Sequence, residues 1–471
     1  MSALVQGWFQ KQFDLIKQQY LQAGDLPFSD VLTEQTITES LQAIKGRWND
    51  RIYTPLVTLW LFLGQVLSAD HGCRAVVARL IAHRISRGQS SCSANTSAYC
   101  QARKRLPEEF FSKAACKVGQ SLDAQTDPSW LWKGRRVYMF DGTTVSMPDT
   151  PKNQQEYPQN PTQKPGLGFP IARLAGIVSL SCGAILSLGI CRYAGKGQSE
   201  RSLLRQLWDI LQPGDILLTD ALLSSWAEML LLKQRGVDSV SRMNKAVRRA
   251  DFSLGKQLGK EDHIVRWPKP SSIRWLDWPT YKSLPDYLEV REIKVRVEQP
   301  GFRTRSLVVV TTLLDPTQTT KEELANLYRR RWSNELDIRS IKIALQMDIL
   351  RCKTPESVRK EIWTHVLAYN LIRTVMAQSA LRHSVQPRTI SFKGTLQILE
   401  AFHPILAIRG KQEFMALENI YELMLDAVAA HRVADRPNRF EPRKRKRRPR
   451  KADRLMIPRD EWKAQQLEGV T

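Results

Sequence analysis

Three acidic residues occupy positions where their chemistry could be put to use. Asp141 and Asp220 each end a short apolar run, 136–140 and 214–219, and Glu335 lies in a long helical pattern. Carboxylates at strand ends of an α/β sheet can converge on one site. Such groups suit Mg²⁺, with Mn²⁺ expected to substitute, and two ions about 3.5–4 Å apart would promote in-line phosphoryl transfer. Each aspartate alone is equally typical of a turn or cap.

The segment from Tyr328 to Lys342 carries polar residues at helical spacing. An α-helix turns about 100° per residue, so with Tyr328 at zero, Arg331, Glu335 and Lys342 fall at about −60°, −20° and −40°. This predicts one aromatic ring, two cations and one carboxylate on a single stripe. The stripe beside it predicts the buried face of the helix: Leu327, Ile338, Ile341 and Leu345.

The same spacing also fits an amphipathic surface helix with a row of solvated ion pairs. Glu335 follows Arg331 by four residues and precedes Arg339 by four. Pairs of this kind stabilise a helix by about 0.2–0.5 kcal/mol each, with no ligand involved. The helix alone does not show whether this stripe is a functional site or a surface row of ion pairs. The elements around it have to decide.

The charge of the chain indicates a polyanionic partner. It has 471 residues, enough for two to four domains, with 71 Lys and Arg against 47 Asp and Glu, a formal charge of +24. The run 443–451 holds eight basic residues, and removing them from +24 still leaves +16 on the remainder. Nucleic acid is the partner that such a charge favours, ahead of a membrane surface, although a merely basic protein is the alternative.

The cysteines and apolar runs point to a protein of the cytoplasm. Seven cysteines form no CxxC pair, which favours free thiols over a disulfide framework or zinc site. The first twenty residues lack the pattern of a signal peptide. The uncharged run 174–191 has a Ser-Cys-Gly turn signal at its centre, so it predicts two buried strands and not a membrane span.

Residues 1–120 show helical periodicity and are predicted to form an N-terminal DNA-binding domain. One helix is expected between Ser97 and Pro107, and residues 120–135 resemble a linker. Four side chains of that helix are of types that contact phosphates and base edges: Tyr99, Gln101, Arg103 and Arg105. The alternative is a solvated helix end, favoured by its dipole.

The middle of the chain predicts an α/β sheet with helices on its faces. A strand stopped by a turn at Asp141, a hairpin over 174–191, a helix over 199–211, a strand ending at Asp220, a helix over 224–235 and a strand over 237–243 follow in order. Arg242 and Lys245, after the last of these strands, are candidate DNA contacts. Residues 250–315 then predict a β-rich insertion, with strands over 288–297 and 306–312 around a Pro300-Gly301 turn.

These motifs resemble those of a known family. Asp141-Gly-Thr, Asp220 within GDILLTDALLSSW, and Tyr328-x2-Arg331-x3-Glu335-x6-Lys342 are similar to the DDE transposases of bacterial insertion sequences, and more narrowly to the group named for its Tyr-Arg-Glu-Lys (YREK) signature. The resemblance spans roughly residues 30 to 450 and includes Tyr369-Asn370-Leu-Ile-Arg373, Arg388-Thr-Ile-Ser-Phe-Lys393 and the basic tail.

The resemblance implies an RNase H-like catalytic core, interrupted by a β insertion before the glutamate helix. It implies that Asp141, Asp220 and Glu335 form the metal-binding catalytic triad. Tyr328, Arg331 and Lys342 would hold phosphates near the scissile end, with Trp332 stacking or packing beside that DNA. In several members a tryptophan upstream of the signature tyrosine receives a flipped base. Leu307 stands near that place here, and the candidates are Trp267, Trp275 and Trp278.

The resemblance further implies that the protein cuts the ends of its mobile element by hydrolysis and joins the 3′-OH to double-stranded target DNA. A homodimer is expected because two ends must be brought together. The alternatives are a non-catalytic DNA-binding protein of the same fold and a host nuclease that never joins strands. The predicted parts are an N-terminal domain (1–120), the first part of the core (130–249), the insertion (250–315), the glutamate helix (316–350), C-terminal helices (351–435) and a basic tail (436–471).

Overall fold

In this computed structural model the N-terminal part is helical, as predicted. The structure describes residues 39–44, 52–86, 88–221, 224–296, 306–409, 414–433 and 453–468. The N-terminal helices are α3 (Pro55–Leu67), α4 (Cys73–Ser86), α5 (Ser97–Arg105) and α6 (Glu108–Ala124). Helix α3 is buried on nearly every side because its sequence, PLVTLWLFLGQVL, carries no charge. The linker predicted from residue 120 is wrong in its first part, since α6 continues to Ala124 with Val118 and Leu122 in the core.

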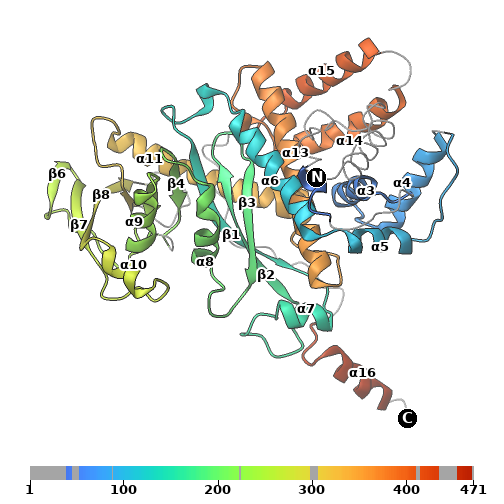
Figure 1. The fold of residues 1–471 in the computed structure, drawn as a ribbon, viewed down its shortest axis with the longest axis horizontal. Helices are drawn as coiled ribbons and strands as arrows, with labels where there is room; N and C mark the ends of the chain where they lie inside the picture. The colour runs from blue at the N-terminus through green and yellow to red at the C-terminus, as the bar shows by residue number, and fades with distance from the viewer. Residues whose placement is uncertain are drawn as a thin grey trace.

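One nine-stranded sheet runs through the molecule in the order β3-β2-β1-β4-β5-β9-β8-β7-β6 (Figure 1). Its first five strands are β1 (Val137–Ser146), β2 (Ile171–Ser179), β3 (Ile185–Arg192), β4 (Ile216–Thr219) and β5 (Asp238–Arg242). Strands β1, β2 and β3 pair antiparallel, whereas β1, β4 and β5 pair parallel. This order, with helices between β3, β4 and β5, is the mixed α/β topology of the RNase H-like core that the sequence predicted.

The hairpin predicted over 174–191 is confirmed as β2 and β3. Its turn contains Gly183, whose φ of +83° is readily adopted only by glycine. A Cβ at this position would lie 2.9 Å from Nε of Arg373, so the turn also needs glycine to let that guanidinium approach. The run therefore lies within the sheet, and among the described helices none is long and apolar enough to cross a membrane.

The β-rich insertion extends the same sheet. It contributes β6 (Lys256–Gly259), β7 (Asp262–Pro268), the short helix α10 (Trp278–Ser283), β8 (Tyr287–Arg296) and β9 (Ser306–Thr311). Strand β9 pairs antiparallel with β5 and joins the insertion to the core, while the predicted Pro300-Gly301 turn lies outside the described residues. A second apolar cluster, around Trp226, Trp267 and Val290, fills the insertion on one side of this junction.

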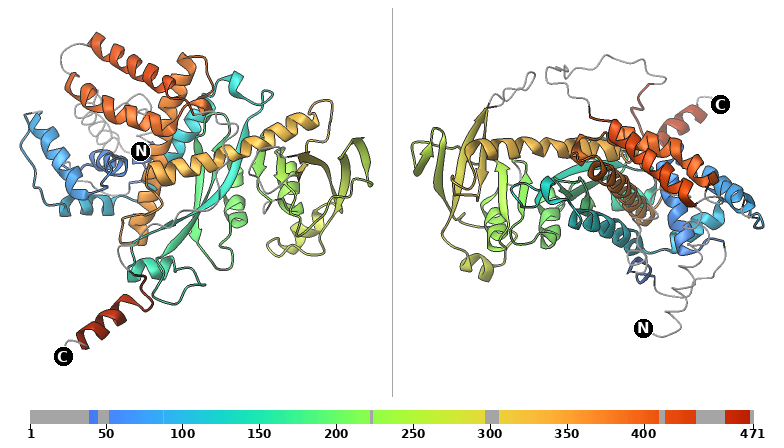
Figure 2. Two further views of the ribbon diagram at one scale, coloured as in Figure 1. Left: turned by 180° about the vertical axis from the view of Figure 1, so that it is seen from behind. Right: turned by 90° about the horizontal axis from the view of Figure 1, so that it is seen from above.

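Helices cover both faces of the sheet. Helices α8 (Glu200–Leu207) and α9 (Trp226–Gln234) lie on one face, and the helical segment 321–344 crosses the other (Figure 2). The segment 321–344 leads from the insertion to α13 (Pro355–Arg382), which packs against α6 and α3. The remaining elements of the described residues are α7 (Pro151–Glu156), α14 (Phe392–Arg409), α15 (Phe414–Ala430), α16 (Arg459–Glu468), four 3₁₀ turns (Pro128–Trp130, Trp208–Ile210, Arg330–Trp332 and Pro387–Thr389) and one π-turn (Ser340–Ala344).

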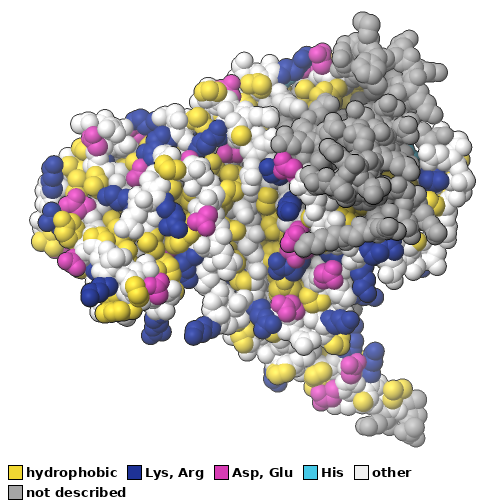
Figure 3. Space-filling model, viewed as in Figure 1, with side chains coloured by type: hydrophobic (Ala, Val, Ile, Leu, Met, Phe, Trp, Pro, Cys, Tyr) yellow, Lys and Arg dark blue, Asp and Glu magenta, His cyan; other side chains and the backbone are white. Residues whose placement is uncertain are grey.

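Positive charge is spread over the folded surface. On the face seen in Figure 3, Lys and Arg side chains are distributed over both the core and the insertion. The eight-residue basic run 443–451 lies outside the described residues. The observed surface thus agrees with the predicted excess of positive charge outside that run.

Candidate active site

Two of the three carboxylates stand side by side at the centre of the sheet. Strands β1 and β4 pair in parallel, with Val137 opposite Ile216 and Met139 opposite Leu218. Continuing this register by two residues places Asp141 beside Asp220. The parallel pairing of β1 with β4 therefore brings Asp141 and Asp220 together, as predicted from their positions after two apolar runs.

The two aspartates differ in their local structure. Asp220 directly follows β4, whose four residues are all buried, as predicted. The predicted strand end at Asp141 is wrong, because β1 continues to Ser146 and keeps pairing with β2. The Gly-Thr-Thr sequence after Asp141 forms strand and not turn, and the Gly142 amide donates a hydrogen bond of 2.8 Å to Oδ1 of Asp141.

Arg331 links Asp141 to the third carboxylate. Its Nη1 lies 3.4 Å from Oδ2 of Asp141, and its Nη2 lies 3.6 Å from Oε1 of Glu335. The Arg331 side chain is 12% exposed, that of Asp141 21% and that of Glu335 64%. The guanidinium thus occupies the space between two carboxylates, one on β1 and one on the helical segment, and holds both loosely.

The pKa of Asp141 shows how closely the acidic groups are placed. Burial raises the pKa of Asp141 above its usual range, and the charges of Asp220 and Glu335 raise it further. The Gly142 hydrogen bond and the Arg331 charge act in the opposite direction. Asp141, Asp220 and Glu335 therefore lie close enough to repel one another, and a site of this kind is suited to a cation.

The helical segment that bears Glu335 is not one regular α-helix. Helix α11 (Lys321–Arg329) begins with a capping box at Thr320, passes through a 3₁₀ turn at 330–332, and continues as α12 (Ser333–Arg339) and a π-turn at 340–344. The projection at 100° per residue is therefore wrong in detail, because 3₁₀ and π turns change the angle per residue. The predicted buried face is largely confirmed: Leu327, Ile341 and Leu345 are core residues, and Ile338 is half-buried.

The end of this segment is tied to β1. Nζ of Lys342 donates a 2.8 Å hydrogen bond to the backbone oxygen of Thr144. Just beyond it, the Ser146 amide donates to the Asp348 oxygen, and the Leu350 amide donates to the Ser146 oxygen. These bonds fix the glutamate-bearing segment against the strand that carries Asp141.

Tyr328 lies close enough to Arg331 and Arg242 for both charges to act on its hydroxyl group. Tyr328 is 7% exposed, and burial raises its pKa, against the lowering effect of the Arg331 and Arg242 charges. Nε of Arg242 and Nε of Arg331 are both buried without a hydrogen-bond partner among the described residues. Lys245 is exposed in the turn after β5. Trp332 lies in the 3₁₀ turn, and its side chain is outside the described part of the structure.

The N-terminal candidates divide into two pairs. Tyr99 is fully buried and donates a 2.9 Å hydrogen bond to Oε1 of Gln65, and Arg103 binds the same oxygen at 3.1 Å. Both side chains belong to the interior of the helical region, which argues against direct contact with DNA. Gln101 and Arg105 are exposed on the same helix. The helical alternation of buried and exposed positions explains this division.

A buried ion cluster lies beside the site, and the spacing of residues in the sequence did not predict it. Asp337, two residues after Glu335, accepts hydrogen bonds from Arg373 of α13 and from Arg388, whose Nη1 lies 2.6 Å from each carboxylate oxygen. Arg388 also donates to the backbone oxygens of Ser179 and Leu180. The cluster joins the helix of Glu335 to the end of β2 and to α13. One indication of this cluster was present in the sequence: Arg373 and Arg388 each belong to one of the two C-terminal motifs of the family resemblance.

Glu200 is a second residue that sequence spacing did not reveal. Its carboxyl group lies against Gly142, where a Cβ would be 2.4 Å from Cδ of Glu200. Its pKa is raised, first by burial and then by the charges of Asp141 and Asp220, while Arg173, at 3.6 Å, lowers it. The residue follows the Ser199 cap of α8, and nothing in that pattern indicated proximity to the aspartates.

The donor set fits a hard divalent cation in its chemistry. Asp141, Asp220 and Glu335 supply the carboxylate oxygens that Mg²⁺ and Mn²⁺ prefer. No three His, Cys, Asp or Glu side chains of the described ranges converge closely enough to hold an ion as they stand. The long ion pairs of Arg331 explain this arrangement, because its guanidinium supplies the positive charge between Asp141 and Glu335.

Comparison with known proteins identifies the class of protein that this fold and site define. Residues 132–371 match the family model described as Transposase DDE domain. The match runs from just before β1 into α13 and includes Asp141, Asp220 and Glu335. The chain belongs to this family of DDE transposases.

The chain is also similar to individual proteins. The chain is 27% identical over 400 residues to the transposase InsG for insertion sequence element IS4 of Escherichia coli strain K12, covering 83% of this chain and 85% of that protein. It is 35% identical over 72 residues to the putative transposase InsL for insertion sequence element IS186A of the same strain, covering 15% of this chain and 20% of that protein. Among solved structures, a piggyBac transposase synaptic complex with hairpin DNA aligns over 87% of this chain and 86% of that chain, with 8% identity and a TM-score of 0.43.

Proposed function

We propose that the protein is a Mg²⁺-dependent DNA transposase of the YREK group. It would cleave the ends of its insertion sequence and join the freed 3′-OH to target DNA. One observation carries the proposal. Asp141 lies on β1, Asp220 directly follows the adjacent parallel strand β4, and Arg331 connects Asp141 to Glu335 of the crossing helical segment.

Asp141, Asp220 and Glu335 would hold the metal, with Mn²⁺ able to replace Mg²⁺. When bound, the two ions would activate the attacking oxygen and stabilise the leaving oxygen of the phosphoryl transfer. Arg331 gives up its contacts with Asp141 and Glu335 and turns to the DNA. The 64% exposure of the Glu335 side chain leaves that carboxylate room to rotate toward the aspartates.

Tyr328, Arg331, Arg242 and Lys342 would hold phosphates of the strand that is cut. The Nε atoms of Arg242 and Arg331 are buried and have no hydrogen-bond partner in the described part of the chain. This supports the role, because an unmade hydrogen bond of a buried charged group is costly and a phosphate oxygen would supply it. Trp332 would lie beside the same DNA. Lys245, Gln101 and Arg105 are exposed residues suited to contacts farther along the duplex.

The proposed oligomeric state and the roles of the two terminal regions follow from the need to bring two transposon ends together. A homodimer would bind both transposon ends, with the N-terminal helices as a DNA-binding domain and the run 443–451 adding affinity that does not depend on sequence. Such a protein would act in the bacterial cytoplasm, at the nucleoid.

The central test replaces the carboxylates one at a time with their amides, in Asp141→Asn, Asp220→Asn and Glu335→Gln. The substrate is the DNA that flanks the coding region, which should carry short inverted repeats. We expect each variant to bind this DNA as the unchanged protein does and to lose Mg²⁺-dependent cleavage by at least about 1,000-fold. Normal cleavage by any one variant would remove that residue from the triad. A pre-cut end offered together with target DNA then separates a transposase, which joins the strands, from a nuclease, which does not.

A salt titration tests the phosphate contacts. Lys342→Ala should weaken DNA binding and make the slope of log K against log salt shallower by about 1, since one phosphate contact no longer releases its counterion. Lys260→Ala, an exposed lysine of the insertion far along the chain from the segment, is the control and should keep the slope. An unchanged slope for Lys342→Ala would exclude Lys342 as a phosphate ligand.

A further inference from the structure

Two half-buried thiols meet in the N-terminal helical region, where α4 and α5 both pack against α3 (Figure 1). Cys73 is the first residue of α4, and Cys100 lies within α5. Nη2 of Arg103 lies 3.5 Å from Sγ of Cys73 and 3.7 Å from Sγ of Cys100. One guanidinium nitrogen therefore contacts sulfurs from two different helices, and the proposed phosphoryl transfer uses neither thiol.

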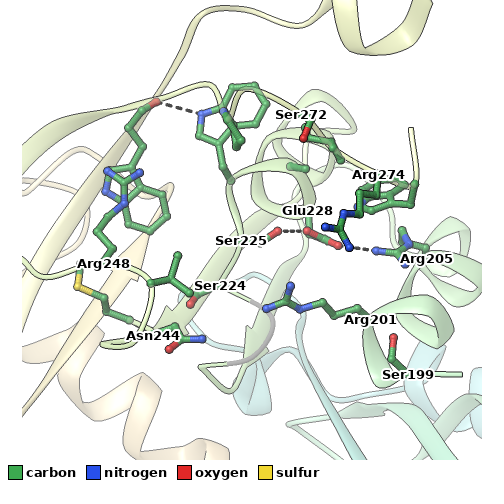
Figure 4. A pocket seen from close by; sticks show the side chains of 18 residues that line it. Ser199, Arg201, Arg205, Ser224, Ser225, Glu228, Asn244, Arg248, Ser272 and Arg274 are labelled. Atoms are coloured by element: carbon green, nitrogen blue, oxygen red, sulfur yellow. Dashed lines mark hydrogen bonds and ion pairs between the residues drawn. The ribbon is translucent and has the colours of Figure 1, made fainter. Parts of the chain in front are cut away.

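Arg103 has unusual partners for an arginine that points inward. Arg205 of α8, for example, pairs with the carboxylate of Glu228 on α9, as Figure 4 shows. Among the described residues, the guanidinium of Arg103 meets the amide oxygen of Gln65, the two sulfurs and two aromatic rings at 4.7 and 4.6 Å, and no carboxylate within ion-pair distance. A cation whose nearest potential anions are sulfurs favours the thiolate form of those sulfurs.

The two thiols are not equivalent. A hydrogen bond from Cys73 lowers the pKa of Cys100, and the charge of Arg103 lowers it further, against the effect of burial. The same hydrogen bond, together with burial, raises the pKa of Cys73. Cys100 thus carries the negative charge of the pair, while Cys73 keeps its proton. A low-pKa thiolate that is partly exposed and has a second thiol beside it is the arrangement that reacts with oxidants.

We propose that Cys73 and Cys100 form a peroxide-sensitive thiol pair that closes to a disulfide between α4 and α5. The Cys100 thiolate attacks one oxygen of hydrogen peroxide, the O–O bond breaks, and hydroxide leaves as a sulfenic acid forms. The Cys73 sulfur then attacks the Cys100 sulfur, so that the S–S bond forms, the S–O bond breaks and water leaves. The hydroxide takes up the proton that Cys100 had released. Two thiols lose two electrons in total, and one peroxide gains them and becomes two waters.

The disulfide changes how α5 is held. Arg103 lies where this helix joins its neighbours, since its Nη1 binds Gln65 of α3, and Lys360 of α13 donates to two backbone oxygens of the last turn of α5. Oxidation removes the thiolate charge from beside Arg103 and leaves that cation poorly compensated. Gln101 and Arg105, the exposed residues of α5, then hold DNA less firmly. This last step rests on the proposed function, whereas the thiol chemistry does not.

The first test needs no variant. The reduced full-length protein is treated with hydrogen peroxide at pH 7, the remaining thiols are alkylated, and the peptides are mapped by mass spectrometry. A Cys73–Cys100 disulfide should form at least about tenfold faster than Cys191 is oxidised, because the thiolate fraction controls the rate. Cys191 is the matched internal control: it is half-buried and near the charge of Arg173, but burial raises its pKa.

Variants then assign the roles. Cys73→Ser should stop the reaction at a sulfenic acid on Cys100, which dimedone traps. Arg103→Met should slow the oxidation of Cys100 about tenfold, and Arg103→Lys should recover part of the rate because it keeps the charge. If Arg103→Met does not fold, the mapping of the unchanged protein decides. Oxidation of Cys191 as fast as Cys100, or a disulfide that joins Cys100 to Cys352, would overturn the thiol pair.

A binding assay tests the consequence. The oxidised protein should bind a duplex of the element's end about fivefold more weakly at 0.15 M salt, the equivalent of one phosphate contact. Cys191→Ser should show the same loss on oxidation, and Cys100→Ser should show none. A mapped disulfide with unchanged DNA affinity would overturn the effect on α5. Failure of the proposed function would look different: the triad variants would cleave normally, and the disulfide would still form.

Discussion

Helix α12 carries two carboxylates, two residues apart, in opposite environments. Asp337 is 2% exposed and lies 2.6 Å from Nη1 of Arg388, with Arg373 as a second partner. Glu335 is 64% exposed, and its partner Arg331 stands 3.6 Å away. The first carboxylate has short bonds and buried partners, and the second has one long ion pair at the edge of the site.

The difference distinguishes ion pairs that hold the fold, such as those of Asp337, from ion pairs that can open, such as those of Arg331. A buried carboxylate between two arginines is fixed, because leaving either charge unpaired would cost several kcal/mol. The two pairs of Arg331 are longer, at 3.4 and 3.6 Å, and one of them involves the exposed Glu335, so a stronger cation or a phosphate can replace them. Asp337 therefore positions the helix, while Arg331 and the carboxylates around it remain free to exchange partners.

The largest expected effect comes from neutralising each of the two carboxylates in turn with an isosteric amide. Asp337→Asn should lower the free energy of unfolding by about 3–5 kcal/mol, because Arg373 and Arg388 lose their buried counter-charge. For a chain of this length, we expect the melting temperature to fall by about 3–5 °C. Calorimetry of Glu335→Gln, at an exposed position, should show a change within about 1 °C, although its cleavage is lost. Equal melting temperatures for the two variants would show that Asp337 does not hold the helix in place.

A smaller effect is expected at Arg331. Its long ion pairs, unlike those of Asp337, make it a counter-ion that another cation can replace. Arg331→Met should lower the melting temperature of the metal-free protein by a few degrees, since Asp141, Asp220 and Glu335 then repel one another without relief. Added Mn²⁺ should raise the melting temperature more in this variant than in the unchanged protein, where the ion must displace the guanidinium. Arg329→Met, two residues away and exposed, is the control. The same Mn²⁺ response in all three proteins would contradict the exchange.

The same contrast explains which parts of the structure the sequence could predict. The order of strands and helices, the placement of Asp141 and Asp220 on neighbouring strands and the burial of Leu327, Ile341 and Leu345 follow from periodicity and from the rules of α/β sheets. The cluster of Asp337 with Arg373 and Arg388 depends on side chains 36 and 51 residues apart, and no local spacing encodes such a contact. Glu200 reaches the site only because Gly142 lacks a side chain, and the burial of Tyr99 could not be predicted because a polar residue type does not reveal it.

The smallest expected effect tests the electrostatic cost of the functional cluster through Asp141. Because its pKa in the folded protein is raised, the ionised form costs stability at every pH above the raised value, and this cost disappears below the unfolded pKa, about 3.9. Asp141→Asn should therefore raise the melting temperature of the metal-free protein by about 1–3 °C near pH 7, with the gain shrinking toward pH 4. The gain is small because the variant also loses the contact with Arg331. Mn²⁺ should stabilise the unchanged protein and leave the variant nearly unaffected. Thermal melts over a pH series, with and without Mn²⁺, measure both, and a lower melting temperature for the variant at pH 7 would mean that Arg331 fully compensates the cluster in the resting protein.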